Sequence, residues 1–166
     1  MAVILLCIVY AGTTSWRANV EYGADPREFL VTTQSAEQVR GVRDEVQAIA
    51  DRAEREGRSI NITVDAAEGA TFPWAWYFRH LAAGYIDLSG APLPSDADVA
   101  ILTEGSRARL LPQLAGYDGR RFPFRVWWIR DYGKLDPGSA LRWLVEREPW
   151  SPTGGMPEWL YIRQGA

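Results

Sequence analysis

Two carboxylates stand where a β-sheet could bring them together. Asp65 ends an alternating apolar segment at residues 59–65, and Glu104 ends another at residues 98–104. Such alternation predicts strands, and open α/β sheets gather ligand-binding groups at the carboxyl ends of their strands. A pair of carboxylates beside aromatic side chains is the arrangement of a glycoside hydrolase. The alternative is that both acids form structural ion pairs with arginines. Three arginines could serve as such partners: Arg79, Arg125 and Arg130.

Aromatic and arginine side chains alternate in the segment RRFPFRVWWIRDYGK, residues 120–134. As a strand, this segment would bury four apolar side chains on one face: Phe122, Phe124, Val126 and Trp128. The other face and the turn that follows carry the side chains that we expect to contact a ligand: Arg125, Trp127, Arg130 and Asp131. Guanidinium groups stack on aromatic rings and keep their charge, so a planar, anionic or sugar-like ligand would suit this face. The alternative is a core strand whose arginines pair with nearby carboxylates.

A second aromatic segment, FPWAWYFRHL, covers residues 72–81. Helical spacing would place Trp74 and Phe78 on one face together with Leu81. Four side chains of this segment are candidate ligand-binding groups: Trp74, Trp76, Arg79 and His80. We expect part of the segment to line one cleft with Asp65 and Glu104 at the carboxyl edge of the sheet. The alternative for His80 is a purely structural hydrogen bond.

Other reactive residue types are scarce. His80 is the only histidine and Cys7 the only cysteine, which excludes a histidine metal cluster, a cysteine metal site and an internal disulfide. The sequence has no glycine-rich phosphate-binding loop. We therefore assign no catalytic residue, no metal and no cofactor. The net charge of −3 and the pI near 5.2 argue against a nucleic-acid partner, because such proteins usually carry a basic face.

The first twelve residues, MAVILLCIVYAG, are apolar without interruption. They are too few to span a bilayer, which takes about 20 residues, and they lack the basic start of a signal peptide. Two interpretations remain, a buried core element or the last turns of a transmembrane helix that begins upstream. We favour the second, because Trp16 and Arg17 follow the run as they do at the interfacial end of a membrane helix. The expected parts are a membrane-helix end at 1–17, a linker at 18–27 and a soluble domain at 28–166.

Periodicity and capping residues predict the first elements of the soluble domain. A strand at 28–34, a helix that begins at Ser35 with a capping box and ends at Gly57, and the strand at 59–65 would form a parallel βαβ unit. Five apolar residues recur on one face of this helix: Val39, Val42, Val46, Ile49 and Ala53.

The remaining elements follow after residue 84. They are a short strand at 85–88, the strand at 98–104, a brief helix at 106–114 interrupted by Pro112, the strand within 120–134, a helix that Asp136 and Pro137 begin, a loop at 151–157 and a strand at 159–163. Leu141, Leu144 and Val145 should give the helix after Asp136 its buried stripe. The predicted fold class is α/β, with a mixed, partly parallel sheet and helices on both faces.

The order of six blocks along the chain resembles one family of membrane proteins. The blocks are FLVTTQS, ITVD, FPWAWYFRHL, YDGRRFPFRVWWIRDY, LRWLVEREPW and WLYIR. With the N-terminal apolar run, they resemble the C-terminal extracytoplasmic domain of the flippase-activity-associated proteins. These proteins are related to dolichyl-phosphate-mannose protein mannosyltransferases and have the GT-C glycosyltransferase fold. The resemblance covers nearly the whole chain and rests on the order and spacing of the aromatic blocks.

The resemblance implies a multi-pass parent protein in the cell membrane that handles polyprenyl-phosphate-linked sugars. This domain would lie on the extracytoplasmic side, and the catalytic and metal-binding residues would lie in the membrane part of the parent. The expected function is contact with an acceptor or glycan. The expected partners are the membrane domain of the parent chain and a glycan or lipid-linked sugar. A non-catalytic packing domain and a small carboxylate-based glycoside hydrolase remain as alternatives.

Overall fold

The structure, a computed structural model, describes residues 1–21, 23, 25–27 and 33–166. The chain divides into two compact units. Unit 1 consists of Met1–Ala36 and Arg125–Gly155, and unit 2 consists of Glu37–Phe124 and Met156–Ala166. The chain therefore starts in unit 1, builds most of unit 2, returns to unit 1 and ends in unit 2.

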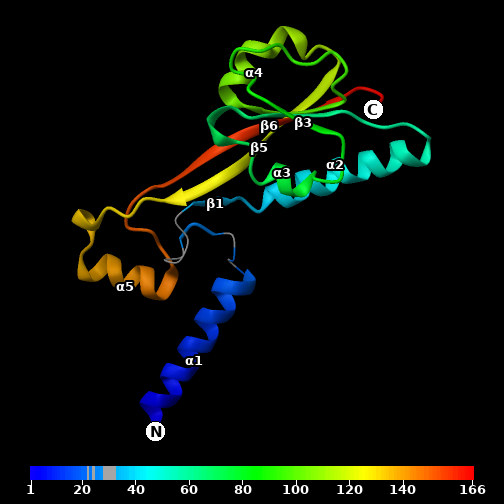
Figure 1. The fold of residues 1–166 in the computed structure, drawn as a ribbon. Coiled ribbons are helices and arrows are strands. Elements are labelled where there is room, and N and C mark those ends of the chain that lie inside the picture. Colours follow the sequence, from blue (N-terminus) through cyan, green and yellow to red (C-terminus); the bar gives the residue numbers. More distant parts are fainter. Residues whose placement is uncertain (22, 24, 28–32) are drawn as a thin grey trace. The chain divides into compact units, whose positions relative to one another are not determined.

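The described strands form a mixed sheet in the order β1-β5-β6-β4-β2-β3 (Figure 1). Their bounds are β1 Thr33–Ser35, β2 Ile62–Asp65, β3 Ala83–Ile86, β4 Val99–Thr103, β5 Tyr117–Trp128 and β6 Thr153–Arg163. Strand β2 is parallel to both β3 and β4, whereas the β1–β5 and β4–β6 pairs are antiparallel. The predicted α/β class, with a mixed and partly parallel sheet, is confirmed.

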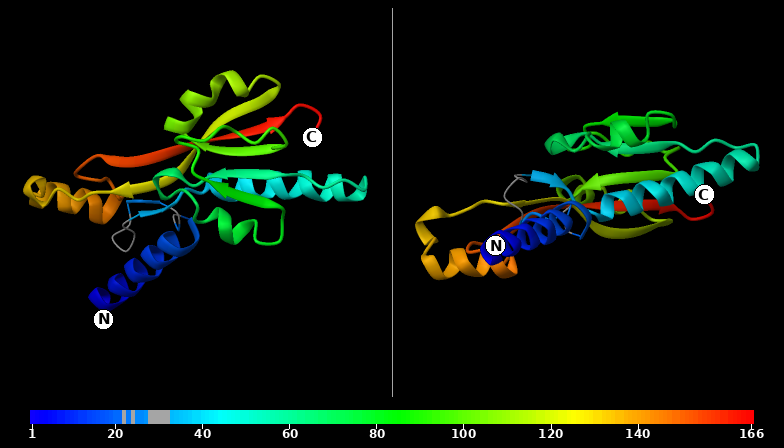
Figure 2. Two further views of the ribbon diagram at one scale, coloured as in Figure 1. Left: turned by 45° about the horizontal axis from the view of Figure 1, so that its top comes forward. Right: turned by 90° about the horizontal axis from the view of Figure 1, so that it is seen from below.

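In unit 2, helices α2 (Gln38–Arg55) and α3 (Trp74–Tyr77) cover one face of the strands (Figure 2). The five apolar residues predicted for one face of α2 are all buried. They join one core cluster with Val64 of β2, Ile101 of β4 and Phe124 of β5. Glu56 and Gly57, the latter with φ +71°, end the helix as expected.

Helix α4 (Glu104–Leu110) lies on the other face of the same strands. Side chains alternate along β4, so Val99 and Ile101 join the α2 cluster while Ala100 and Leu102 pack in a second cluster with Leu110. A 3₁₀ turn that contains Pro112 follows α4 directly. The predicted helices on both faces are thus present, and the brief helix before Pro112 starts two residues earlier than expected.

The expected start of the soluble domain is wrong in two respects. Ser35 belongs to β1 and does not cap α2, whose N-cap is Glu37 without a side-chain hydrogen bond. Strand β1 pairs with β5, with Thr33 opposite Trp127, so β1 and β2 are not neighbours as a simple βαβ unit would have them. Residues 28–32 of the predicted strand lie outside the described residues.

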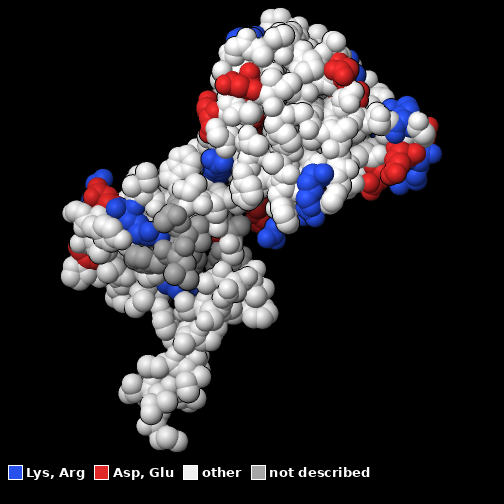
Figure 3. Space-filling model, in the orientation of Figure 1, with Lys and Arg blue, Asp and Glu red and all other residues white. Residues whose placement is uncertain are grey.

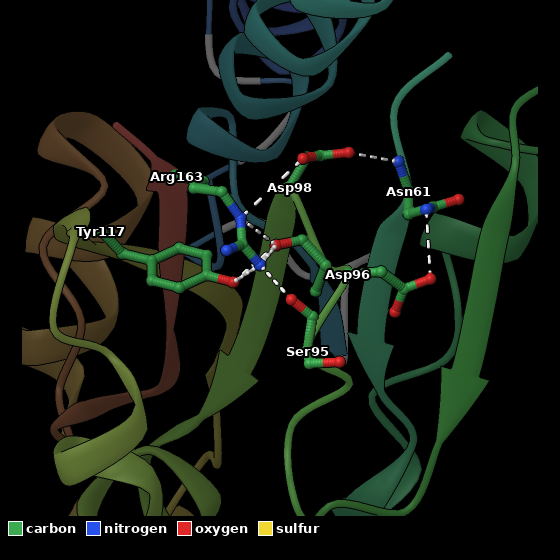
Figure 4. Close-up of polar contacts among 7 residues, drawn as sticks. Asn61, Ser95, Asp96, Asp98, Tyr117 and Arg163 are labelled. Atoms are coloured by element: carbon green, nitrogen blue, oxygen red, sulfur yellow. Dashed lines mark hydrogen bonds and ion pairs between the residues drawn. The ribbon is translucent and has the colours of Figure 1, made fainter. Parts of the chain in front are cut away.

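Arg163 at the end of β6 organises a polar cluster at the amino-terminal end of β4 (Figure 4). Its Nη2 donates to the carbonyls of Ser95 (2.6 Å) and Ala97 (2.7 Å) and to the hydroxyl of Tyr117 (2.7 Å). Asp98 accepts a hydrogen bond from the backbone N–H of Asn61 (2.9 Å). These contacts tie the loop before β4 to β2, β5 and β6, which is a structural role.

Unit 1 begins with the apolar helix α1 (Ala2–Trp16), which continues as a π-helical turn over Arg17–Glu21. None of the residues of α1 is buried, and no charged side chain is coloured along it on the face shown in Figure 3. The alternative of a buried core element is therefore wrong. By length and composition Ala2–Val20 could cross a membrane. Helical structure extends into the first residues of the predicted linker.

Helix α5 (Pro137–Glu146) of unit 1 begins as predicted. Asp136 Oδ1 accepts hydrogen bonds from the N–H groups of Gly138 (2.7 Å) and Ser139 (3.0 Å), and the Ser139 hydroxyl completes the capping box. The predicted buried stripe is wrong, because Leu141, Leu144 and Val145 are all exposed. The capping residues determine where a helix starts, but they carry no information on which surface covers it.

Candidate functional site

The two carboxylates lie at the same edge of the sheet, as expected. Asp65 ends β2 and Glu104 follows β4, and these two strands are adjacent and parallel. The environments of the two acids differ, however. Only 1% of Asp65 is exposed, whereas the side chain of Glu104 is about half exposed, at 51%. The two acids therefore do not form a pair that opens to solvent, which a glycoside hydrolase would need.

Asp65 is a structural acceptor. Its Oδ1 accepts hydrogen bonds from the N–H groups of Ala67 and Leu88 (3.0 Å each), and its Oδ2 accepts from the N–H (3.2 Å) and hydroxyl (2.6 Å) of Thr103. Burial opposes ionisation, but the neighbouring hydroxyls of Ser106 and Thr103 and the two N–H groups outweigh it and hold the pKa of Asp65 below its ordinary value. The carboxylate joins three loops at the edge of the sheet.

Glu104 contacts the exposed Arg121 and the half-buried Trp159 at the same edge. Its Oε2 accepts a hydrogen bond from Nε1 of Trp159 (2.9 Å) and lies 3.5 Å from Nε of Arg121. Arg107 stacks on the same indole, with its guanidinium carbon 4.0 Å from the ring centre. Glu104 is therefore paired with an arginine and a tryptophan on the surface. This is close to the alternative of a structural ion pair, although the arginine is Arg121 and not Arg79, Arg125 or Arg130.

The four candidate ligand-binding residues of the 72–81 segment lie in different environments. Trp74 is buried, donates from Nε1 to Oε2 of the buried Glu158 (2.9 Å) and belongs to the core. Trp76 is 60% exposed, and the guanidinium of Arg79 lies 4.3 Å from its ring centre. The exposed His80 lines a pocket of about 250 Å³ beside α2. The single cleft predicted for these residues with Asp65 and Glu104 is therefore wrong, because Asp65 and Trp74 are both buried.

The remaining candidates lie in unit 1, where the end of β5 forms an open pocket of about 400 Å³ that we call the aromatic pocket. Its lining residues are Thr33, Trp127, Trp128, Ile129, Arg130 and Tyr132. Among them Trp128 is buried, whereas Tyr132 and Ile129 are 63% and 74% exposed. Two predicted ligand-binding residues, Trp127 and Arg130, thus line one pocket. The other two predicted ligand-binding residues, Arg125 and Asp131, do not line it.

Contacts with the chain segment around Ser151 hold the Trp128 side chain in place. Nε1 of Trp128 donates to the buried Ser151 hydroxyl (2.8 Å), which in turn donates to the carbonyl of Ile129 (3.0 Å). The ring of Trp150 lies edge-on to Trp128 at a centroid distance of 4.5 Å. Its Nε1 donates to the carbonyl of Asp131 (3.1 Å). These contacts hold the buried Trp128 side chain in a fixed position beside the pocket.

Trp127 occupies its place because β6 offers a glycine opposite it. A Cβ on Gly154 would lie only 2.3 Å from Nε1 of Trp127, so any other residue would collide with the indole. Gly154 and Gly155 belong to β6, so the predicted loop at 151–157 is wrong from Thr153 onward. Glycine in a strand often marks the close approach of another group, as it does here.

Arg130 and Asp131 have different roles. The Arg130 guanidinium carbon lies 5.3 Å from the ring centre of Trp128, at the wall of the aromatic pocket. Asp131 fixes the turn, because its Oδ1 accepts from the N–H of Gly133 (3.1 Å) and its Oδ2 lies 3.3 Å from Nζ of Lys134. Arg125 is half-buried on β5 opposite Ser35. Neither Asp131 nor Arg125 lines the aromatic pocket.

Chemically, the lining of the aromatic pocket combines aromatic rings with one guanidinium. Its volume falls in the range of roughly 300–1,000 Å³ that is common for small-molecule sites, which are mostly apolar with a few placed polar groups. Ring faces suit apolar faces of a ligand, and a guanidinium suits a phosphate or carboxylate. Among the described residues, no group of three or more His, Cys, Asp or Glu side chains could hold a metal ion. The pocket is equipped for binding rather than for acid–base chemistry.

No protein-family model, no curated protein and no solved structure matches this chain. Sequence reasoning missed Thr33, Tyr132, Trp150 and Ser151. The dense aromatic content of residues 127–150 was a usable signal for Tyr132 and Trp150. Nothing in the sequence indicates that Thr33 and Ser151 would meet β5, because strand pairing brings them there.

Proposed function

We propose that this chain is the soluble extracytoplasmic part of a GT-C-type membrane glycosyltransferase that handles polyprenyl-phosphate-linked sugars. In this proposal α1 anchors the domain in the cell membrane, and the aromatic pocket contacts the sugar or its phosphate. The catalytic residues belong to the membrane domain of the parent chain, which is the partner of this domain. The order of aromatic blocks in the sequence supports the same assignment.

The observation that carries the proposal is the composition of the aromatic pocket. Trp127 and Tyr132 contribute aromatic rings to its lining, which suit a pyranose, and Arg130 contributes a permanent positive charge, which suits a phosphate. A phosphate-linked sugar presents both groups a few bonds apart. The carboxylates at the sheet edge do not support a competing hydrolase, because Asp65 is buried and saturated with hydrogen bonds.

The location of the aromatic pocket in the chain also favours a lipid-linked ligand. The pocket and α1 belong to the same compact unit. A sugar on a polyprenyl phosphate cannot leave the membrane surface, so its binding site must lie on a part of the protein that is held close to the membrane. An exposed apolar helix is the element of this chain that would hold unit 1 there.

A binding experiment with three probes tests the proposal. The full chain in detergent micelles is titrated with a short-chain polyprenyl phosphohexose, with the same polyprenyl phosphate without sugar, and with the free hexose. Trp127→Ala should weaken binding of the phosphohexose by about tenfold or more, which corresponds to a loss of about 1.4 kcal/mol in binding free energy. Arg130→Gln should weaken binding of both phosphate-bearing probes. The matched control is Trp76→Ala, which removes another exposed indole that stacks with an arginine.

Stability measurements separate loss of binding from loss of fold. Trp128 is buried, so Trp128→Ala should cost about 3–5 kcal/mol and serves only as the reference for a destabilised pocket. Trp127 is half-buried and packs on Gly154, so Trp127→Ala should lower the melting temperature by clearly less than Trp128→Ala does. Equal affinity of wild type and Trp127→Ala would refute glycan binding here. The domain would then be better described as a non-catalytic packing domain.

A further inference from the structure

The apolar face of α5 is exposed, although its spacing is that of a buried stripe. Leu141, Leu144 and Val145 follow each other at intervals of three and one and so lie on one side of the helix. Their exposed fractions are 60%, 44% and 59%. Three further apolar side chains just before α5 are also exposed: Ile129, Tyr132 and Leu135. Exposed apolar side chains gathered on one helix face are typical of sites that contact a protein or a membrane.

Within unit 1, α5 contacts the apolar helix α1. The hydroxyl of Tyr10 donates a hydrogen bond to the carbonyl of Leu144 (3.2 Å). Tyr10 precedes Trp16 by six residues, which is about 9 Å along a helix at 1.5 Å per residue. If Trp16 and Arg17 mark the membrane–water interface, α5 meets α1 about 9 Å below it. Interfacial helices bury their apolar face to about 5–10 Å, so the depths agree.

The charges around α5 identify the kind of contact. Between residues 129 and 150 the sequence has four basic and four acidic residues. The basic residues are Arg130, Lys134, Arg142 and Arg147, and the acidic residues are Asp131, Asp136, Glu146 and Glu148. A balanced set gives no net attraction to anionic headgroups. Contact with the membrane would therefore be driven by the apolar face, and two nearby indoles, Trp143 and Trp150, suit the interface.

We propose that α5 is an interfacial helix that lies in the plane of the membrane beside α1, with Leu141, Leu144 and Val145 among the upper acyl chains. This inference rests on the proposed function in one point, the role of α1 as membrane anchor. It deepens that function, because the turn at Tyr132–Lys134 joins the aromatic pocket directly to α5. A pocket held at this level can receive the headgroup of a lipid-linked sugar without lifting the lipid out of the bilayer.

Depth-dependent quenching of single-cysteine labels tests the inference on the full chain. In a Cys7→Ser background, Leu141→Cys carries an environment-sensitive fluorophore, and the protein is reconstituted into phosphatidylcholine vesicles with nitroxide-labelled lipids. Quenching at position 141 should be several-fold stronger than at Arg142→Cys, the adjacent exposed position off the apolar face. Arg55→Cys on α2 of unit 2 provides the water-exposed reference. Circular dichroism confirms that each exposed substitution leaves the fold intact.

A second sample, the wild-type chain labelled on its native Cys7, reports independently on whether α1 enters the membrane. Quenching at Cys7 without quenching at position 141 would overturn the interfacial helix and leave the proposed anchor standing. Absence of quenching at both positions would overturn both. A label at 141 that is shielded from aqueous iodide yet not quenched by nitroxide lipids would mean that protein covers α5, which also overturns the inference. Stronger quenching in vesicles with phosphatidylglycerol only would contradict the apolar driving force.

Discussion

The Asp65 carboxylate accepts four hydrogen bonds at the carboxyl end of β2, from the backbones of Ala67, Leu88 and Thr103 and from the Thr103 hydroxyl. Each oxygen is fully engaged, so the residue joins loops instead of facing a ligand. Asp65→Asn would turn an amide NH₂ toward two of these donors. We expect the free energy of unfolding to fall by at least about 2 kcal/mol in urea titrations, because buried donors lose their acceptor. The exposed Glu104→Gln is the control and should change it by less than about 0.5 kcal/mol.

The same carboxylate predicts a dependence of stability on pH. Because folding lowers the pKa of Asp65, its contribution is present above the unfolded-state value of about 3.9 and is lost as the pH falls through the folded pKa. The stability difference between wild type and Asp65→Asn should therefore be constant from neutral pH to the unfolded-state pKa and should shrink below it. A difference that grows toward acid pH would show that the carboxylate is destabilised in the fold.

At the scale of elements, Gly154 of β6 and the indole of Trp127 on β5 depend on each other. A Cβ at position 154 would lie 2.3 Å from Nε1 and 2.7 Å from Cε2 of Trp127, and an indole is too rigid to yield by a small rotation. Gly154→Ala should lower the melting temperature and change the shape of the aromatic pocket. Gly41→Ala on α2 is the matched control, because a Cβ there meets nothing within 4 Å. That control should stabilise the protein by about 0.5–1 kcal/mol, and a stabilising Gly154→Ala would refute the described packing.

Helices α2 and α5 show what periodicity can and cannot predict. Both have apolar residues at helical spacing, and the sequence predicted the core residues of α2 correctly. The same pattern failed for α5, because periodicity shows that a face is apolar but not whether protein, lipid or water covers it. Alternation of apolar side chains predicted β4 to within one residue at each end and the end of β2 at Asp65, although β2 begins three residues later than predicted.

Strand pairing explains most of the remaining differences. The position of β1 beside β5 depends on contacts between residues about 90 positions apart, which local patterns do not encode. That pairing brings Thr33 to the aromatic pocket, and the 151–155 segment brings Ser151 and Gly154. Sequence reasoning therefore found Trp127 and Arg130 from their residue types but could not assemble the pocket around them. It also placed Asp65 at the correct edge of the sheet but did not predict that Asp65 is buried.

At the scale of the whole molecule, α1 is the element whose removal should cost the fold least. None of its residues is buried, and one side-chain hydrogen bond to α5 is described, from Tyr10 to Leu144. Deleting residues 1–12 should leave the urea unfolding curve nearly unchanged and should make the protein soluble without detergent. Sedimentation and circular dichroism of the shortened and full chains check this. Loss of folded structure on deletion would mean that α1 serves the core after all.

The most direct test of glycan binding is ¹⁹F NMR of the full chain labelled with 5-fluorotryptophan. The eight tryptophans give one signal each, and single Trp→Phe variants assign them. On addition of the short-chain polyprenyl phosphohexose, we predict that the signals of Trp127 and Trp128 shift with a saturable dependence on concentration. The signals of Trp74 in the core and Trp159 at the carboxyl edge should stay in place. A shift confined to Trp76 or Trp159, or no shift at all while the probe remains in solution, would contradict the assignment of the aromatic pocket.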